Sequence, residues 1–333
     1  MNKLFLFSTI TCAALTVTGC SNSELSASEE NAPKAIGFDV YQGRMPVTRA
    51  ATDGTSIQTS GFGVLASRTS GDWTSSATPN FLYNQKVTYS NSNWTYTPTK
   101  YWPTNTDKIS FWAYAPYDDS NITFSGVSEQ GAPTATVTLP NDADLDFVAD
   151  CAMNKTYQTS SGNVEFSLKH VMTRAAFKIV GQNLPENTNL KITSIKLSGT
   201  KLYSSATYTF PTSDSNTGGS WGSQSSTNNT ITLTQDISEG TNSNYLYLIP
   251  VESLGEGEIS VEVSYTVTLP GDAPVSKTST VNIPAGGLAM GKSYLYTFTY
   301  DIREDSGSDF HPISFSATVT PWDSDTTGNL GQQ

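Results

Sequence analysis

The chain has 333 residues and a formal net charge of −12, with 30 Asp and Glu against 18 Lys and Arg. An excess of negative charge repels phosphate backbones, which argues against nucleic acid as a partner. Only 14% of the residues are charged, whereas aromatic residues make up 11% and Ser, Thr, Asn and Gly are abundant. This composition is typical of secreted β-proteins, because hydroxyl and aromatic side chains suit a half-buried pleated surface.

Residues 1–19 have the pattern of a secretory signal peptide. Lys3 precedes an apolar run from Leu4 to Val17, which is too short to span a bilayer stably. Thr18 and Gly19 then place small residues before the thiol of Cys20, which can carry diacylglycerol. We therefore predict that signal peptidase II cleaves between Gly19 and Cys20, and that lipid on Cys20 anchors the chain to the outer membrane. The alternative is an ordinary signal peptide followed by a cysteine that stands there by chance.

After this processing, Cys151 is the single cysteine with a free thiol. It cannot form an internal disulfide, so the fold must be stabilised by its core. The chain has two histidines, His170 and His311, and a cysteine nucleophile needs a basic partner. We interpret Cys151 as a structural residue, and His170 as a core or domain-interface residue because it lies in phase with a strand's apolar face.

Alternation of apolar and polar residues is the dominant pattern of the mature chain, and it predicts β-strands. The longest example is Ile259–Leu269, in which every odd-numbered residue is apolar and every even-numbered residue is polar. The other predicted strands are, in chain order, Phe62–Ala66, Lys86–Ser90, Ile109–Tyr114, Thr134–Leu139, Val164–Leu168, Ala175–Val180, Leu190–Leu197, Tyr245–Ile249, Tyr294–Tyr300 and Ile313–Val319. Short strands separated by turn residues predict an all-β protein made of antiparallel β-sandwiches.

About 310 mature residues are too many for one small sandwich and suit two domains. The predicted organisation is a signal peptide at 1–19, a tether and first strand at 20–49, an N-terminal sandwich at 50–170 and a C-terminal sandwich at 171–333. Ser213–Asn229 is rich in Ser, Thr, Asn and Gly, and we interpret it as a long hairpin loop.

Nothing in the sequence has the spacing of a catalytic or metal site, so we predict no enzyme activity, no metal and no cofactor. Zinc-protease, serine-hydrolase and phosphate-loop motifs are absent. The acidic run Asp142–Asp146 could bind calcium, but it lacks the regular spacing and terminal glutamate of an EF-hand. A solvated loop is therefore the favoured interpretation. A glycoside hydrolase would need two carboxylates that face each other across a cleft, and no spacing in the sequence indicates such a pair.

A group of aromatic residues between positions 94 and 117 has two interpretations. Aromatic faces stack on sugar rings, so the group could form a glycan-binding surface. Most members alternate along predicted strands, however, which favours core packing. The group comprises Trp94, Tyr96, Tyr101, Trp102, Phe111, Trp112, Tyr114 and Tyr117.

Part of this aromatic group also carries a family resemblance. Lys100–Pro103 has the sequence KYWP, and Lys108–Tyr117 has the sequence KISFWAYAPY. Both resemble signature segments of fimbrillin-like proteins, the type V pilins of Gram-negative anaerobes. Phe166–Ala175 (FSLKHVMTRA) is similar to the segment by which that family enters its second domain, and Val319–Asp323 (VTPWD) also fits.

The resemblance implies a fold and an assembly mechanism. It implies two transthyretin-like β-sandwich domains in a protein exported as a lipoprotein. A trypsin-like protease then removes the lipid together with the first strand, and a C-terminal strand of a neighbouring subunit fills the vacated groove. The matching first strand here has Ile36, Phe38 and Val40 pointing inward, and the matching cleavage site is Arg49–Ala50. Arg44 is a second candidate for cleavage, and Arg49 could instead be an ordinary exposed loop arginine.

The sequence does not decide which position the subunit takes in the fibre. The strand with Ile313, Phe315, Ala317 and Val319 either is donated, as in a stalk subunit, or closes its own domain, as in a tip or minor subunit. We predict a structural subunit located at the outer membrane and in the fimbrium. Its predicted partners are other pilin subunits, a processing protease and outer-membrane lipid, with a host or glycan receptor left open. The alternative is a surface-exposed glycan-binding lipoprotein.

The lipidation prediction can be tested at a single residue. Cys20→Ala removes the thiol that accepts the lipid, so we expect the variant to lose palmitate labelling and to leave the membrane fraction. Metabolic labelling followed by fractionation measures both effects. Unchanged labelling of the variant would show that Cys20 is not the lipidated residue.

Overall fold

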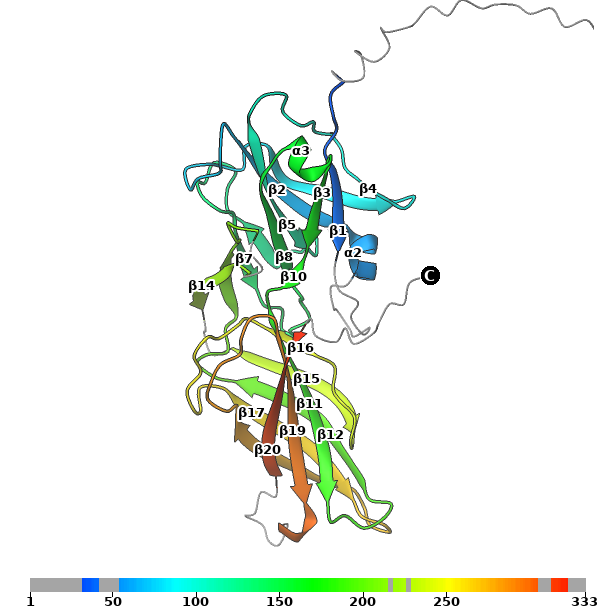
Figure 1. Cartoon of the computed structure of the whole chain (residues 1–333). Helices are drawn as coiled ribbons and strands as arrows, with labels where there is room; N and C mark the ends of the chain where they lie inside the picture. Colours follow the sequence, from blue (N-terminus) through cyan, green and yellow to red (C-terminus); the bar gives the residue numbers. More distant parts are fainter. Residues whose placement is uncertain (1–31, 42–53, 215–217, 226–228, 305–312, 323–333) are drawn as a thin grey trace, which may run out of the picture. The chain divides into compact units, whose positions relative to one another are not determined.

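A computed structural model describes residues 32–41, 54–214, 218–225, 229–304 and 313–322. The chain from Ala35 onward forms one compact unit by its internal contacts. Nearly all of the regular structure is β, which confirms the all-β prediction (Figure 1). Two short α-helices occur in the described residues, α2 (Gly54–Ser60) and α3 (Tyr157–Ser160). A 3₁₀ turn, η1, spans Ile302–Glu304.

The first half of the chain forms one large antiparallel sheet and a separate two-stranded pair. The large sheet has the strand order β10 (Lys169–His170), β8 (Val148–Lys155), β5 (Lys108–Ala115), β2 (Phe62–Thr69), β3 (Leu82–Ser90) and β4 (Asn93–Thr95). The pair consists of β1 (Gly37–Tyr41) and β9 (Asn163–Ser167), which run parallel to each other.

The second half contributes two four-stranded sheets. One has the order β16 (Leu246–Leu248), β11 (Thr173–Gln182), β19 (Lys292–Asp301) and β20 (Ile313–Pro321). The other has the order β15 (Thr230–Ser238), β12 (Asn189–Ser198), β17 (Ser260–Thr268) and β18 (Val275–Asn282).

One further sheet joins strands from both halves of the sequence. Its order is β14 (Ser220–Ser225), β13 (Ser205–Thr209), β7 (Thr134–Thr138) and β6 (Ile122–Phe124). Two of its strands precede the predicted boundary at residues 170–171 and two follow it, so the division into two domains stays a prediction. The interpretation of Ser213–Asn229 as a loop was wrong for β14, because pairing with β13 supplies its backbone with partners.

Two buried clusters form the core. The smaller one gathers apolar side chains from β1, β2, β5 and β9, with Phe38, Phe62, Phe111 and Phe166 among them. The larger one contains side chains from residue 65 to residue 322, including Trp112, Tyr208 and Trp322. Apolar contacts therefore run continuously across the predicted boundary between the domains.

Strand β17 has the alternation that the sequence predicts. Its odd-numbered side chains are buried, while the even-numbered ones are half-exposed. Val263 is fully buried, and Ser264 lies on the opposite face beside Thr278 of β18.

Two substitutions test this register. Val263→Asp places an unpaired carboxylate among apolar side chains, so we expect the free energy of unfolding to fall by about 3–5 kcal/mol. Ser264→Asp should change it by no more than about 0.5 kcal/mol, because the half-exposed face stays hydrated. Urea denaturation measures both values. Equal losses in the two variants would contradict the assigned faces.

Candidate functional site

The predicted processing sites lie outside the described residues. These are Gly19 and Cys20 for lipidation, and Arg44, Arg49 and Ala50 for proteolytic maturation. They stay predictions. The two strands predicted to take part in assembly are described, and they form the candidate site.

Strand β1 is tied to the chain by backbone hydrogen bonds. The Ile36 N–H donates to the Lys100 carbonyl at 2.9 Å, and the Gly37 N–H donates to the Gly162 carbonyl at 3.1 Å. The Tyr96 hydroxyl donates to the Ile36 carbonyl at 3.0 Å. Among the described residues, β9 is the strand that pairs with β1, apart from an isolated bridge at residue 35. One strand neighbour therefore holds β1 through its backbone.

Side-chain burial holds β1 much more firmly. Phe38 is 2% exposed and packs against four aromatic rings. Its ring centroid lies 5.0 Å from Tyr96, 5.7 Å from Phe111, 6.0 Å from Phe166 and 6.5 Å from Phe62. The contacts with Phe62 and Phe111 are edge-to-face and the one with Phe166 is stacked, and both arrangements add to the gain from apolar burial.

The neighbours of Phe38 on β1 follow the same alternation. Ile36 is 2% exposed, and Val40 is half-buried against the same cluster. Asp39 faces solvent, where its carboxylate accepts from the Asn163 amide at 2.9 Å. An extended segment with apolar residues at every second position therefore fits this groove, and its backbone can pair with β9.

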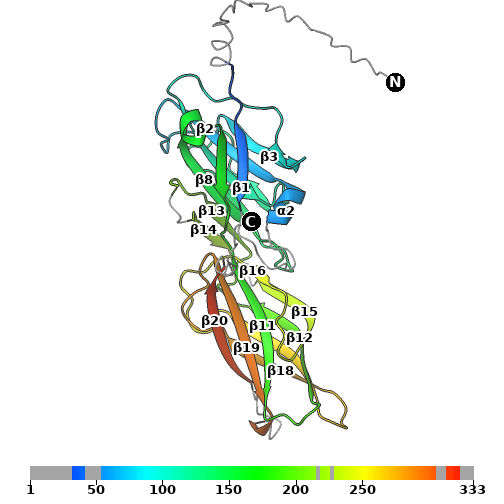
Figure 2. The same ribbon diagram turned by 45° about the vertical axis from the view of Figure 1, so that its right-hand side comes forward.

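Strand β20, unlike β1, lies at an exposed edge and buries little of its side chains. It pairs with β19 and lies at the edge of its sheet (Figure 2). Ile313 and Phe315 are half-buried, whereas Ala317 and Val319 are exposed, Val319 at 51%. Phe315 packs against Tyr296 with a centroid distance of 5.2 Å. β20 is thus held by its hydrogen bonds to β19 and by few apolar contacts.

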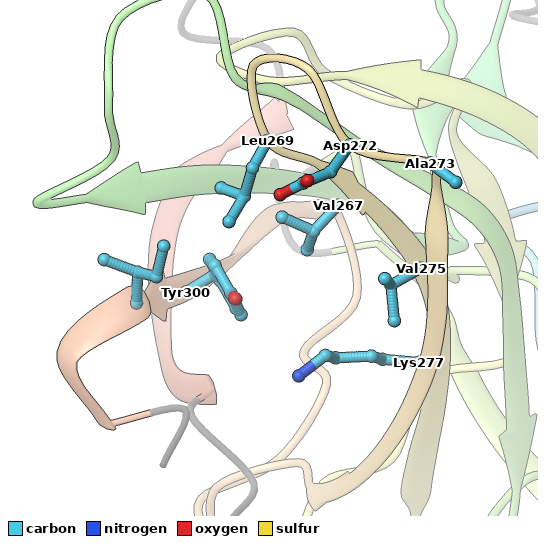
Figure 3. Close-up of a pocket in the computed structure, with 8 residues that line it drawn as sticks. Val267, Leu269, Asp272, Ala273, Val275, Lys277 and Tyr300 are labelled. Carbon is cyan, nitrogen blue, oxygen red and sulfur yellow. The ribbon is translucent and has the colours of Figure 1, made fainter.

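Two cavities are lined by residues of the second half of the chain, each including part of β19. One, of about 240 Å³, is lined by residues that include Val267, Val275, Lys277 and Tyr300. Figure 3 shows Tyr300 on one side of this cavity and Val275 and Lys277 on the other. The second cavity, of about 340 Å³, includes Val319 in its lining. Both cavities are lined mainly by apolar side chains, with Asp272 and Lys277 in the first lining and Glu252 in the second.

Cys151 is placed as a structural residue. Its side chain is buried, and the thiol donates to the Ser213 carbonyl at 3.2 Å. Burial raises the pKa of the Cys151 thiol to about 12, with the carboxylates of Asp150 and Asp214 adding to the shift. The nucleophilic thiolate is therefore scarce at neutral pH.

His170 and the acidic run 142–146 are brought together by the fold. His170 Nδ1 lies 2.9 Å from Asp146 Oδ1, and both side chains are fully buried. Asp146 thus belongs to the core and not to a solvated loop. Among the described residues, no group of three or more His, Cys, Asp or Glu could hold a metal ion. His311 lies outside the described residues.

The predicted aromatic group is mostly core. Trp102, Phe111, Trp112 and Tyr114 are buried, and Tyr101 is the most exposed member at 50%. Trp94, Tyr96 and Tyr117 are half-buried and pack against the two cores. The described residues therefore offer no observation in favour of a glycan-stacking platform.

Comparison with known proteins agrees with this architecture. A family model described as fimbrillin-like matches residues 48–322. The chain belongs to the fimbrillin-like family. It is 29% identical to the fimbrium subunit Fim1C of Phocaeicola vulgatus, in an alignment that covers 86% of this chain and 90% of the relative.

Solved structures show the same fold. A fimbrial protein from Bacteroides vulgatus has a TM-score of 0.67 at 26% identity, covering 86% of this chain and 99% of the other. A Bacteroides ovatus structure has a TM-score of 0.52 at 16% identity, covering 88% and 99% of the two chains, and supports the fold alone. In the described part of this fimbrillin-like chain, no helix is both long and apolar enough to cross a membrane.

Two features of the site had not been predicted from the sequence. One is the parallel partner of β1, because β9 lies more than 120 residues further along the chain. The other is the role of Trp322, which is fully buried although the strand before it is exposed. A tryptophan directly after an alternating segment was the available signal for it.

The packing of Phe38 leads to a stability prediction for the uncleaved fimbrillin-like chain. Phe38→Ala removes the ring from the aromatic cluster and leaves a cavity, so we expect unfolding to become easier by about 3–5 kcal/mol. Asp39→Asn, on the exposed face of the same strand, is the control and should cost less than about 0.5 kcal/mol. Guanidinium denaturation compares the two variants. If Phe38→Ala is as stable as the control, β1 is not part of the core.

Proposed function

We propose that this chain is a structural subunit of a cell-surface pilus, matured by removal of its first strand and assembled by strand exchange. The observation that carries the proposal is the position of β1. Its apolar side chains complete a core, yet its backbone pairs with a single described strand. A strand held in this way leaves a preformed groove when it is removed.

The relatives support the pilus assignment. Fim1C is named as a fimbrium subunit, and the Bacteroides vulgatus structure is of a fimbrial protein. Together with the family membership, these names support a location in the fimbrium at the cell surface. Such a protein works by assembly and needs no catalytic group of its own.

Export and maturation follow the processing sites predicted from the sequence. Lipid on Cys20 holds the precursor at the outer membrane. Cleavage after Arg49 removes the lipid and the first strand together and releases the remaining chain. A trypsin-like protease would be the processing partner, with Arg44 as the second candidate site. Loss of Ile36 and Phe38 then exposes Phe62, Phe111 and Phe166 to water, which is unfavourable by roughly 25 cal/mol per Å² of apolar surface.

The vacated groove binds an extended segment of another subunit by strand addition. Main-chain hydrogen bonds to β9 would give affinity, and the hollow left by Phe38 would select an apolar side chain at the matching position. The peripheral position of β20, whose residues from Ala317 to Pro321 are exposed, supports the interpretation that this strand is donated. We therefore favour a stalk subunit over a tip subunit.

Net charge contributes little to the switch. Residues 20–49 carry three basic and four acidic side chains, so their removal changes the net charge of the mature chain only from −13 to −12. Charge repulsion between subunits is thus nearly the same before and after cleavage. Assembly must be driven by the exposed groove.

Low-dose trypsin tests the maturation step. We expect native protein to be cut first after Arg49, giving a product that begins at Ala50, binds a hydrophobic dye and oligomerises. Arg49→Ala should block both the cut and the assembly, while Arg44→Ala should leave both intact. N-terminal sequencing and size-exclusion chromatography give the readouts. Assembly of both variants at the wild-type level would contradict the mechanism and favour a glycan-binding lipoprotein.

A further inference from the structure

Strand β20 is followed directly by a buried tryptophan, Trp322, although the last residues of the strand are exposed. The side chains from Ser316 to Pro321 face solvent, whereas Trp322 is 0% exposed. The backbone N–H of Trp322 donates to the Gly291 carbonyl at 2.9 Å, which fixes the backbone at this point. The indole is therefore the main side-chain attachment of the C-terminal half of β20.

The indole packs against His170, Arg174 and Tyr247, and Asp146 pairs with His170; we call these four residues the socket. The His170 ring stacks on it with a centroid distance of 4.2 Å and an interplanar angle of 7°. The Arg174 guanidinium lies 4.8 Å from its centroid, and the Tyr247 ring lies at 5.6 Å. All four socket residues are nine-tenths or more buried.

The socket is held in place by polar contacts of its own. Asp146 binds His170 at 2.9 Å, and Arg174 Nε donates to the Ser293 hydroxyl at 2.9 Å. The Tyr245 ring also lies beneath the Arg174 guanidinium, with its centroid at 4.1 Å. These contacts orient the ring and the guanidinium that meet the indole, and a socket oriented by its own contacts lowers the entropic cost of holding the indole.

The indole itself makes no comparable polar contact. Its N–H is buried and has no hydrogen-bond partner among the described residues. Leaving the socket would restore hydration to that N–H, which offsets part of the lost stacking and cation–π attraction. Stacking and cation–π attraction therefore hold the strand end, while hydration of the freed indole N–H would favour its release.

We propose that the Trp322 socket is a lock that controls when β20 leaves its own subunit. With the indole in the socket, β20 stays paired with β19. Donation of β20 to a neighbour requires the indole to leave first, so the socket sets how readily the strand is released. This inference rests on the proposed function, because it takes β20 as the donated strand.

Hydrogen–deuterium exchange of the uncleaved chain carrying Cys20→Ala tests the lock without any assembly. In Trp322→Ala we expect the peptide covering 313–322 to exchange at least tenfold faster, while the peptide covering β17 stays within twofold of the parent. Trp322→Phe keeps a stacking ring and should fall between them. Thr318→Ala, at an exposed position of the same strand, is the control and should match the parent.

Two outcomes of this measurement overturn the lock. One is unchanged exchange of β20 in Trp322→Ala. The other is an equal rise in β20 and β17, which would make Trp322 an ordinary core residue whose loss loosens the whole unit.

A second measurement separates the lock from the proposed function. After trypsin treatment, Trp322→Ala should assemble at least fivefold faster than the parent, because its donor strand is already loose. Equal assembly rates overturn the lock as the controlling step. If neither protein assembles although Trp322→Ala has the faster β20 exchange, the strand-exchange function fails, and the lock stands as a property of the single subunit.

Discussion

The packing of Phe38 among four aromatic rings is the contact on which the smaller of the two cores depends. It joins a strand near the N-terminus to β2, β5 and β9, which come from three separate stretches of the sequence. Without this ring, Phe62, Phe111 and Phe166 would face one another across an open hollow. Close-packed interiors disfavour such voids, so an empty groove would be costly, and the proposed mechanism fills it with a strand of another subunit.

A hairpin from the second half of the chain strengthens the first half. The Trp112 indole donates to the Pro211 carbonyl at 2.9 Å, and the Asp214 carboxylate accepts from the Met153 N–H at 2.6 Å. Lys155 forms an ion pair with the same carboxylate at 2.7 Å, partly exposed and thus of small energetic value. The backbone pairing of β13 with β7 matters more, because it extends a sheet across the predicted boundary.

The sequence predicted which face of a strand is buried, but it did not predict which distant strands pair. The alternation in Ile259–Leu269 specified the buried face of β17, because side-chain direction along a strand has a period of two. The same rule placed Phe38 inward. The alternation carries no information about which strands pair with each other. The pairings of β1 with β9 and of β13 with β7 were therefore not predictable from it. Ser213–Asn229 has a loop-like composition, yet β14 forms there because an adjacent edge offers backbone partners.

The two end strands are held by different means, and under the proposed strand exchange this difference would give assembly a direction. β1 is fixed by buried side chains and has one strand neighbour, so dissociation alone would expose its aromatic groove at a large cost. Breaking a covalent bond is the practical way to free it. β20 has a full ladder with β19 but few buried side chains apart from Trp322. If β20 is the donated strand, its backbone pairs could be re-formed on another sheet edge once the indole is free. In the proposed mechanism, an irreversible cut that opens the acceptor would precede a reversible release of the donor, and this would order the two steps.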